Sequence, residues 1–412
     1  MGLLSGSLSF RRFRTVQPLP SDFRDTFVDG VNRYAFRENP GHRSREPLVG
    51  WVNVFDPGDA NFSLNTFLYD HYLVLAMRAD KKAVNSRFFH ILLERRYREV
   101  MNERHLDRLG KRYRAEIKEA LEEELLAKAL PAVNTYDVAW DINTGEVFVF
   151  ATSDAVIDQV HGLLHDTFGI IVHPERMVDW LAERWDWQAV ESRIDAWIPG
   201  GVAERQVPVD VDGWHTGNPL KGREERLGSE FLTWLWYESE AHDGYFRLDD
   251  PELEPVSGAA TGEDGAPSPS SSHAAGDEIT LWLDNKLIFR DIDNGEVPGI
   301  TTMVGEAPSA TPEAKLTFRS GKYPVEARIA FQRGEAQWYF TLGLGGVGLE
   351  LKNLKLPVEV KAGDEEKVYE RMYLLEVLMT TMKVLFRQFF AVRTSDAWAG
   401  LIQSWRGADN GR

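Results

Sequence analysis

The chain has 412 residues, of which 43% are hydrophobic and 27% charged, a balance typical of a globular protein with a sizeable core. It contains no cysteine, which excludes disulfides, thiolate nucleophiles and thiolate-bound metals and fits a reducing compartment. No stretch reaches the roughly 18 apolar residues that a membrane span needs, and the first residues lack the pattern of a secretory signal. We therefore expect a cytoplasmic protein that does not contact membranes.

The charge is divided unevenly along the chain. The net charge is −17, which by itself argues against a protein that coats nucleic acid. However, residues 1–118 carry a net charge of +7 and the remaining 294 residues carry −24. Most of the positive charge lies in residues 78–118, where 13 basic residues stand against 6 acidic ones. This segregation of charge along the chain predicts that the protein has one basic face and that a polyanion binds there.

The first elements alternate between strand and helix. Residues 8–16 have the composition of a strand, and Pro20-Ser21-Asp22 opens a helix that places Phe23, Phe27 and Val31 at helical spacing. Residues 67–77 are aromatic and aliphatic enough for a second strand, which leads directly into the basic segment.

The longest helical pattern runs from about residue 86 to residue 129. Its apolar residues recur with a period of 3.6, so that one stripe is buried. Met101-Asn102 and Gly110 are positions where the pattern can break, which leaves one bent helix or two helices as alternatives. Pro131 ends the pattern.

The basic residues of this segment are candidate DNA contacts. Four of them follow at i, i+4, i+7 and i+14, a spacing that places them on one helix face, where they would bind phosphates without reading bases. The alternative is a solvated face balanced by nearby acids, and the residues alone favour that interpretation. The four are Arg104, Arg108, Lys111 and Lys118. The whole candidate set is Arg78, Lys81, Lys82, Arg104, Arg108, Lys111, Arg112, Arg114 and Lys118.

A compact α/β unit and a low-complexity segment follow. A hairpin around Thr144-Gly145, a helix over 153–167, a strand over 169–173 and a helix over 174–187 are expected. Residues 251–277 are mostly Pro, Gly, Ser, Ala and acids, which predicts a disordered linker.

The C-terminal part returns to strands and ends in a long helix. We expect strands near 280–289, 325–332, 336–342 and 349–355, then a helix over 365–392. The predicted division is an N-terminal region over 1–195, an insertion over 196–310 and a C-terminal region over 311–412.

Other motifs favour structural interpretations. Gly343 to Gly348 match G-x-G-x-x-G, but the residues that follow alternate like a strand, which predicts a glycine-rich hairpin rather than a dinucleotide site. His161 and His165 are four residues apart but lack an intervening glutamate and a third ligand. The aromatic stretch Phe231–Tyr237 is expected to be a core helix. We therefore predict no catalytic residue, no metal ligand and no cofactor.

Several weak motifs, in order, resemble the RdgC family of recombination-associated, nucleoid-binding proteins, which are sometimes labelled exonucleases. The resemblance covers roughly residues 8–190 and 310–395, with a large insertion at about 200–310. It is carried by Val49-Gly50-Trp51-Val52, Ala76-Met77-Arg78-Ala79-Asp80-Lys81-Lys82, Ala129-Leu130-Pro131, Val138-Ala139-Trp140-Asp141, Gly321-Lys322-Tyr323-Pro324-Val325 and Leu354-Lys355-Leu356-Pro357.

The resemblance implies a fold and a function. The fold is α+β, with mixed sheets and long amphipathic helices in a horseshoe subunit, and two subunits form a homodimeric ring. The ring encircles duplex DNA without sequence preference and limits access of the RecA recombinase, in the cytoplasm and on the nucleoid. Besides the insertion, the chain departs from its relatives at Ala132-Val133-Asn134-Thr135, where they carry a longer basic and aromatic stretch. The alternatives are a metal-dependent exonuclease and a protein-interaction scaffold without DNA affinity.

Overall fold

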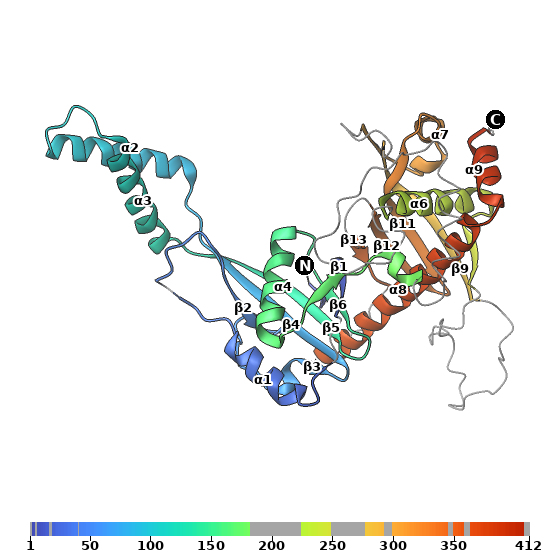
Figure 1. Cartoon of the computed structure of the whole chain (residues 1–412), viewed down its shortest axis with the longest axis horizontal. Helices are drawn as coiled ribbons and strands as arrows, with labels where there is room; N and C mark the ends of the chain where they lie inside the picture. Colours follow the sequence, from blue (N-terminus) through green and yellow to red (C-terminus); the bar gives the residue numbers. More distant parts are fainter. Residues whose placement is uncertain are drawn as a thin grey trace. The chain divides into compact units, whose positions relative to one another are not determined.

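The computed structural model describes residues 2–4, 6–15, 19–39, 41–181, 224–248, 277–291, 299–344, 349–357 and 363–407 (Figure 1). They fall into two compact units. The N-terminal unit consists of Thr15–Val172, and the C-terminal unit consists of Leu3–Arg14 and His173–Arg412. The predicted linker lies outside the described residues except for Asp277, which begins a strand. The predicted boundaries at 195 and 310 stay predictions.

The N-terminal unit contains an antiparallel sheet with the strand order β6-β5-β4-β2. Its strands are β2 (Leu48–Val52), β3 (Leu68–Tyr69), β4 (Tyr72–Lys81), β5 (Ala132–Asp141) and β6 (Glu146–Val149), and β3 pairs with the start of β4. The predicted strand over 67–77 is interrupted by a turn at Asp70, which has a positive φ of 55°. The hairpin predicted at Thr144-Gly145 is present, with Gly145 at a φ of 77°.

Two helices pack on this sheet and on each other. They are α1 (Phe23–Arg33) and α4 (Asp154–Phe168), close to the predicted ranges. The rings of Phe27 and Phe168 lie 4.7 Å apart, and the ring of Phe27 lies 5.6 Å from that of Trp140 on β5. The indole of Trp51 donates a hydrogen bond of 2.8 Å to the hydroxyl of Thr167. This aromatic core fixes the sheet that carries the basic segment.

The basic segment forms a helical hairpin between β4 and β5 (Figure 1). It consists of α2 (Ser86–Glu103) and α3 (Lys111–Lys128), so the chain forms two helices rather than one bent helix. The predicted apolar stripe is buried between them, in a cluster of Phe89, Leu93, Leu109, Ile117 and Leu121. We refer to these two helices and the loop between them as the basic hairpin.

The C-terminal unit contains a second antiparallel array, with the order β10-β9-β11-β12-β13-β1 and β8 paired to β9. Its strands are β1 (Leu8–Thr15), β8 (Tyr245–Leu248), β9 (Asp277–Arg290), β10 (Ile300–Val304), β11 (Tyr323–Arg333), β12 (Ala336–Gly343) and β13 (Glu350–Lys355). Its helices are α6 (Glu224–Ala241), α7 (Pro312–Arg319), α8 (Asp364–Arg393) and α9 (Ala397–Gly407). Short elements are β7 (Val172–Pro174) and the 3-10 turns Leu64–Thr66, Met177–Leu181 and Pro308–Ala310.

The core of the C-terminal unit is aromatic. As predicted, Phe231–Tyr237 belongs to a core helix, α6, and Phe231 and Trp236 are fully buried. The ring of Phe231 lies 5.3 Å from that of Phe386 on α8. Beside them the Nε of Arg393 donates a 2.6 Å hydrogen bond to Glu230, which neutralises a buried charge.

Together these elements confirm the predicted α+β class. β12 and β13 pair antiparallel on either side of the glycine stretch, as a hairpin requires, and residues 345–348 between them lie outside the described residues. The helix expected over 174–187 is, in its described part, the 3-10 turn Met177–Leu181, and its remainder lies outside the described residues. Among the described helices, none is long and apolar enough to cross a membrane.

Candidate nucleic-acid interface

The basic hairpin turns sharply after α2, and the geometry of this turn positions the candidate cations. Arg104 caps α2, and His105 then adopts a left-handed conformation with φ of 52°. The N–H of Leu106 donates to the carbonyl of Met101 at 2.9 Å, and the N–H of His105 donates to that of Asn102 at 3.3 Å. This pair of bonds is a Schellman motif with histidine in the place that glycine usually takes. It ends α2 at Glu103, and seven residues connect that end to the start of α3.

The predicted shared face of Arg104, Arg108, Lys111 and Lys118 is therefore wrong. Only Lys111 and Lys118 lie on one helix, α3, while Arg104 caps α2 and Arg108 lies in the connecting loop. The i+4 spacing fails because the turn at His105 stops the helical rotation. The loop is nevertheless held in place, because Leu109 is buried in the hairpin core.

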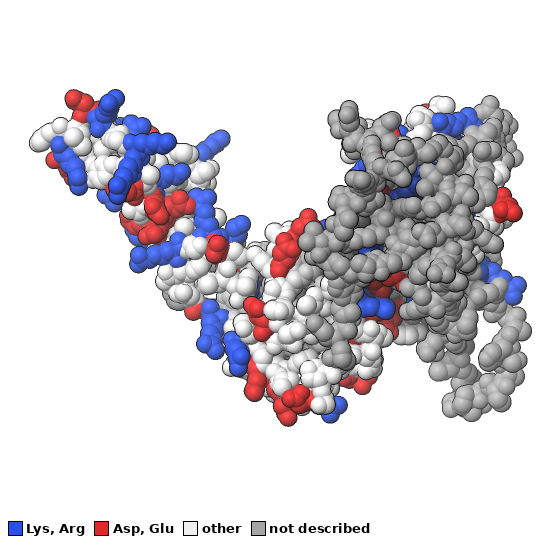
Figure 2. Space-filling model, viewed as in Figure 1, with Lys and Arg blue, Asp and Glu red and all other residues white. Residues whose placement is uncertain are grey.

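The turn still gathers the candidate cations at the outer end of the hairpin. The side chains there are exposed, and they come from the end of α2, from the loop and from the first two turns of α3. They are Arg104, Arg108, Lys111, Arg112, Arg114 and Lys118. Figure 2 shows Lys and Arg over the outer part of the basic hairpin and a cluster of acids nearer the sheet.

Most of these cations are not paired with acids. Arg112 forms an i,i+4 ion pair with Glu116 at 3.1 Å, yet 94% of its side chain stays exposed. Among the described residues, the other five cations form no ion pair. The alternative interpretation, in which nearby acids neutralise these cations, therefore applies only to Arg112. Two of them stack on tyrosines: the guanidinium carbon of Arg104 lies 4.9 Å from the centre of Tyr113, and that of Arg114 lies 5.7 Å from Tyr97. Stacking orients a guanidinium and leaves its N–H groups free to bind a phosphate.

The charges of α3 run against its helix dipole. Its first turn holds Lys111, Arg112 and Arg114 and no acid, whereas Glu119, Glu122, Glu123 and Glu124 lie further along the helix. A helix is normally stabilised by acids at its N-terminus and cations at its C-terminus, each by about 0.3–1 kcal/mol. The N-cap, Gly110, also provides no side chain for the first N–H groups. Cations and unfilled N–H donors at the same helix end create a strongly positive potential that suits an anion.

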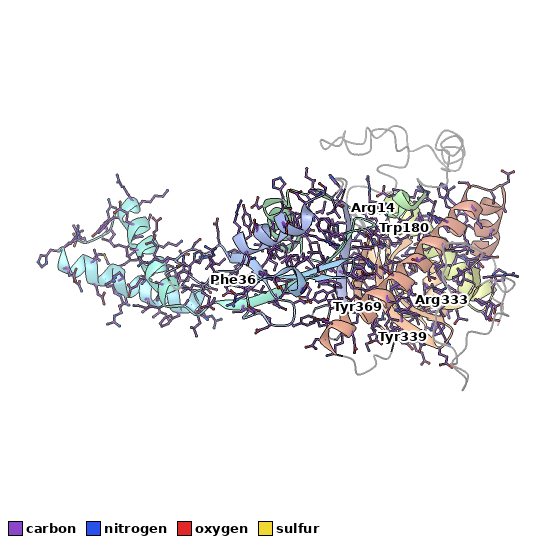
Figure 3. The ribbon with its side chains drawn as sticks, turned by 90° about the horizontal axis from the view of Figure 1, so that it is seen from below. Arg14, Phe36, Trp180, Arg333, Tyr339 and Tyr369 are labelled. Atoms are coloured by element: carbon purple, nitrogen blue, oxygen red, sulfur yellow. The ribbon has the colours of Figure 1, made fainter. Side chains whose placement is uncertain are left out.

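Three further candidate DNA contacts lie at the end of β4, and one of them is exposed enough to reach a phosphate. The guanidinium of Arg78 donates to Asp80 at 2.8 and 2.9 Å and lies 4.2 Å from the centre of the Phe36 ring, which is labelled in Figure 3. The hydrogen bond that Arg78 donates to Asp80, together with the negative charge of that carboxylate, raises the pKa of Arg78, and desolvation by burial opposes this shift. Lys82 is buried and donates to the carbonyl of His42 at 3.0 Å. Only Lys81 is exposed.

The structure adds cations that the sequence did not single out as contacts. The loop from residue 36 to 47 is tied to the base of the hairpin by the Lys82 bond to His42 and by an ion pair between Arg45 and Glu122. Arg37 and Arg43 on this loop are exposed. The sequence signal for them was the excess of arginine in residues 1–50, but their proximity to the hairpin depends on a tertiary contact.

Arg95, Arg96 and Arg98 on α2 are also exposed, but acids partly engage them. Arg95 pairs with Glu99 at 3.0 Å, and Arg96 reaches Glu124 on α3 at 3.5 Å. The Arg96 contact joins the two helices, the Arg95 pair lies within α2, and the Nε of Arg98 donates to the backbone carbonyl of Glu94 at 3.3 Å. We do not add these arginines to the interface.

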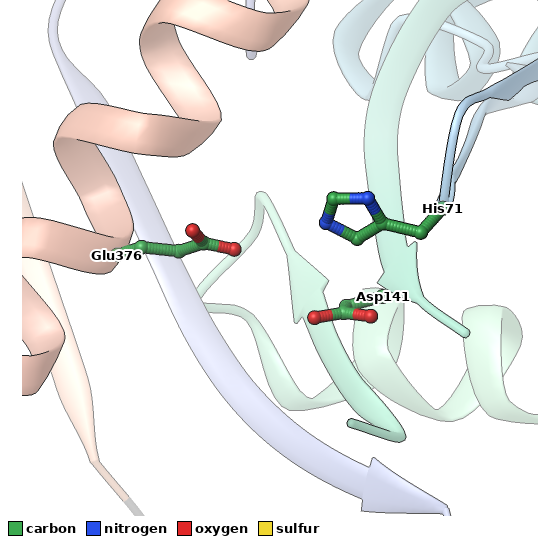
Figure 4. A group of neighbouring side chains, drawn as sticks. All are labelled: His71, Asp141 and Glu376. Atoms are coloured by element: carbon green, nitrogen blue, oxygen red, sulfur yellow. The ribbon is translucent and has the colours of Figure 1, made fainter. Parts of the chain in front are cut away.

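The prediction of no catalytic or metal residue remains untested. Figure 4 shows His71, Asp141 and Glu376; the first two belong to the N-terminal unit and the third to the C-terminal unit. Within its own unit, Asp141 accepts hydrogen bonds from the backbone of Asn143 at 2.8 Å and of Thr144 at 3.1 Å. The Nδ1 of His71 lies 2.7 Å from a carboxylate oxygen of Asp70. Asp141 thus has a structural task in the β5–β6 turn.

Comparison with known proteins relates part of the chain to a family. No curated protein matches it. A family model described as "Putative exonuclease, RdgC" matches residues 13–184. The matched range contains the whole of Thr15–Val172, with the basic hairpin and every candidate cation. On this match the part of the chain from residue 13 to residue 184 is similar to the RdgC family.

Proposed function

We propose that this protein binds duplex DNA without sequence preference and that the outer end of the basic hairpin contacts the phosphates. The observation that carries the proposal is the group of six exposed cations around the turn at His105, beside the N-terminus of α3. Cations placed on a turn and a helix end bind phosphate oxygens but do not present a recognition helix to base edges.

The family match supports a role in recombination, and the rest of the proposal follows the resemblance. The protein acts as a homodimeric ring around DNA, is nucleoid-associated in the cytoplasm, and limits access of the RecA recombinase. It needs no cofactor. The acidic remainder of the chain, residues 119–412, supports this assignment, because its net charge of −24 disfavours contact with DNA.

Salt dependence tests the proposal first. Six phosphate contacts predict a slope of log affinity against log salt of about −5, so affinity falls roughly a thousandfold between 50 and 200 mM salt. Fluorescence anisotropy with unrelated duplexes measures this slope. Equal affinities and equal slopes on different sequences are expected. Absence of binding even at low salt would instead support a protein-interaction scaffold.

Charge reversal locates the contact. The triple variant Arg108→Glu, Lys111→Glu and Arg114→Glu should lower affinity at 0.1 M salt by roughly 10²- to 10³-fold and reduce the salt slope by about 3. The matched control is Arg24→Glu, Arg33→Glu and Lys355→Glu, which changes the net charge equally at exposed sites outside the hairpin. If both triple variants lose the same affinity, only net charge matters and the hairpin is not the contact.

The description of the matching family as an exonuclease favours one second function, a DNA exonuclease. A nuclease of this class would use carboxylates that hold divalent metal ions. Shortening of end-labelled DNA that requires magnesium and stops on addition of chelator would establish it. Intact DNA after a long incubation with magnesium, under conditions where anisotropy shows binding, would reject it.

A further inference from the structure

β10 is an edge strand in the described part of the C-terminal unit, and no described strand pairs with its outer side. Among the described strands it pairs only with β9, from Ile300 opposite Arg290 to Val304 opposite Lys286. The side chains of Ile300, Thr302 and Val304 share one face and are exposed, Ile300 by 60% and Val304 by 76%. A five-residue row of backbone hydrogen-bonding groups therefore lies beside two exposed aliphatic side chains.

This edge lacks the protection that edge strands usually carry. Isolated sheets avoid edge pairing by placing charges, prolines or bulges on the outer strand. The sequence Ile300-Thr301-Thr302-Met303-Val304 contains no charge and no proline, and its register with β9 is continuous. Three of its five residues are threonine or valine and one is isoleucine, so it has the β-branched composition that favours strand pairing. An edge with this composition is expected to pair with another strand.

We infer that β10 docks against β10 of a second copy of this chain. The two strands run antiparallel about a twofold axis at Thr302, so that Ile300 of one copy faces Val304 of the other. This register is self-complementary, as an isologous contact requires. It pairs β-branched side chains across the strands, places threonine opposite threonine, and removes both open edges at once. The contact rests on the homodimer of the proposed function and gives that homodimer a location.

Charge complementarity at the two ends of the strand favours a second copy over another occupant. Lys322 lies beside the start of β10, where its Nζ donates to the hydroxyl of Thr301 at 2.8 Å and a side chain on Gly299 would meet it at 3.4 Å. Glu306 lies just beyond the other end of β10 and is exposed, and in the described part of the chain it forms no ion pair. In the proposed register Gly299 faces Gly305 of the second copy. Each Lys322 therefore lies near the Glu306 of the other copy, twice per contact.

The absence of cysteine allows a direct test of the register, because any introduced thiol is the only one in its chain. Opposing residues of antiparallel strands have Cα atoms about 4.5–5.5 Å apart, within the span of a disulfide. Thr302→Cys should therefore give a disulfide-linked dimer on mild oxidation without DNA. Ile300→Cys alone should not, because the two copies of residue 300 lie about 14 Å apart. A mixture of Ile300→Cys and Val304→Cys chains should cross-link as the mixed pair.

The outcomes separate this contact from the proposed function. All variants are first compared with the unchanged chain by circular dichroism, and sedimentation gives the mass of the unoxidised protein. A dimer by sedimentation with no Thr302→Cys cross-link would overturn the β10 contact and leave the homodimer standing. Equal cross-linking of Thr302→Cys and Ile300→Cys chains would reveal random collision and reject the register. A monomer by sedimentation would reject the homodimer, and the anisotropy experiment would still decide DNA binding separately.

Discussion

Arg78 and Lys81 lie three residues apart on β4, and their environments give them different tasks. The side chain of Arg78 is 13% exposed, bonded twice to Asp80 and stacked on Phe36. Lys81 is exposed at the end of the same strand. In the sequence both are cations in a basic segment, and the charge pattern predicts the same role for both. Only tertiary packing decides which cation stays free to reach a phosphate.

Substitution of these two residues should therefore separate stability from binding. Arg78→Ala leaves the buried carboxylate of Asp80 without its partner and should cost about 2 kcal/mol of stability, while the affinity for DNA stays unchanged. Lys81→Ala should leave stability unchanged and lower affinity about tenfold at 0.1 M salt, as loss of one phosphate contact requires. Urea unfolding and anisotropy on the same preparations measure both quantities. Loss of affinity in a fully folded Arg78→Ala protein would place Arg78 in the interface.

At the level of elements, the basic hairpin shows what periodicity can and cannot predict. The buried stripe was predictable from spacing, because Leu109 keeps its place in the core whether the helix continues or turns. The position of the break between α2 and α3 was not predictable from the sequence. The turn there depends on a positive φ at His105, and a histidine, unlike a glycine, gives no signal of that conformation. The predicted cation face failed for the same reason. The long helices and paired strands were predictable, whereas short elements such as α7 and β10 bury too few residues to show a period.

Two lysines on α3 allow a test of whether binding opposes helix stability. Lys111→Glu places an acid at the N-terminus of α3 and should stabilise it by about 0.3–1 kcal/mol, while it lowers the affinity for DNA by tenfold or more at 0.1 M salt. Lys118→Glu should lower affinity similarly, but it adds repulsion from Glu122 one turn later and should weaken the helix. Hydrogen exchange of the α3 amides reports the local stability. If the protection of the α3 amides from exchange changed in the same direction in both variants, the helix dipole would not explain the effect of these charges.

At the level of the whole molecule, an acidic chain whose residues 13–184 match the RdgC family model contains a strongly basic element. The proposed homodimeric ring makes a topological prediction. Protein bound to closed circular DNA should resist a salt challenge longer than protein on a linear duplex of equal length, because it can slide off linear ends. Retention on immobilised circles before and after cutting by a restriction enzyme measures the difference. Equal loss from both forms would mean that the protein binds one side of the duplex and does not encircle it.

The acids of α3 have a consequence for where a bound duplex can rest. Glu119, Glu122, Glu123 and Glu124 lie between the cations of the outer end and the sheet. In the proposed binding mode, phosphates contact the cations on either side of these acids, at the outer end of the hairpin and at Lys81. The acids between the two groups disfavour phosphate contact along the middle of α3. The duplex would then touch the hairpin at two separate places, with a gap over the acids.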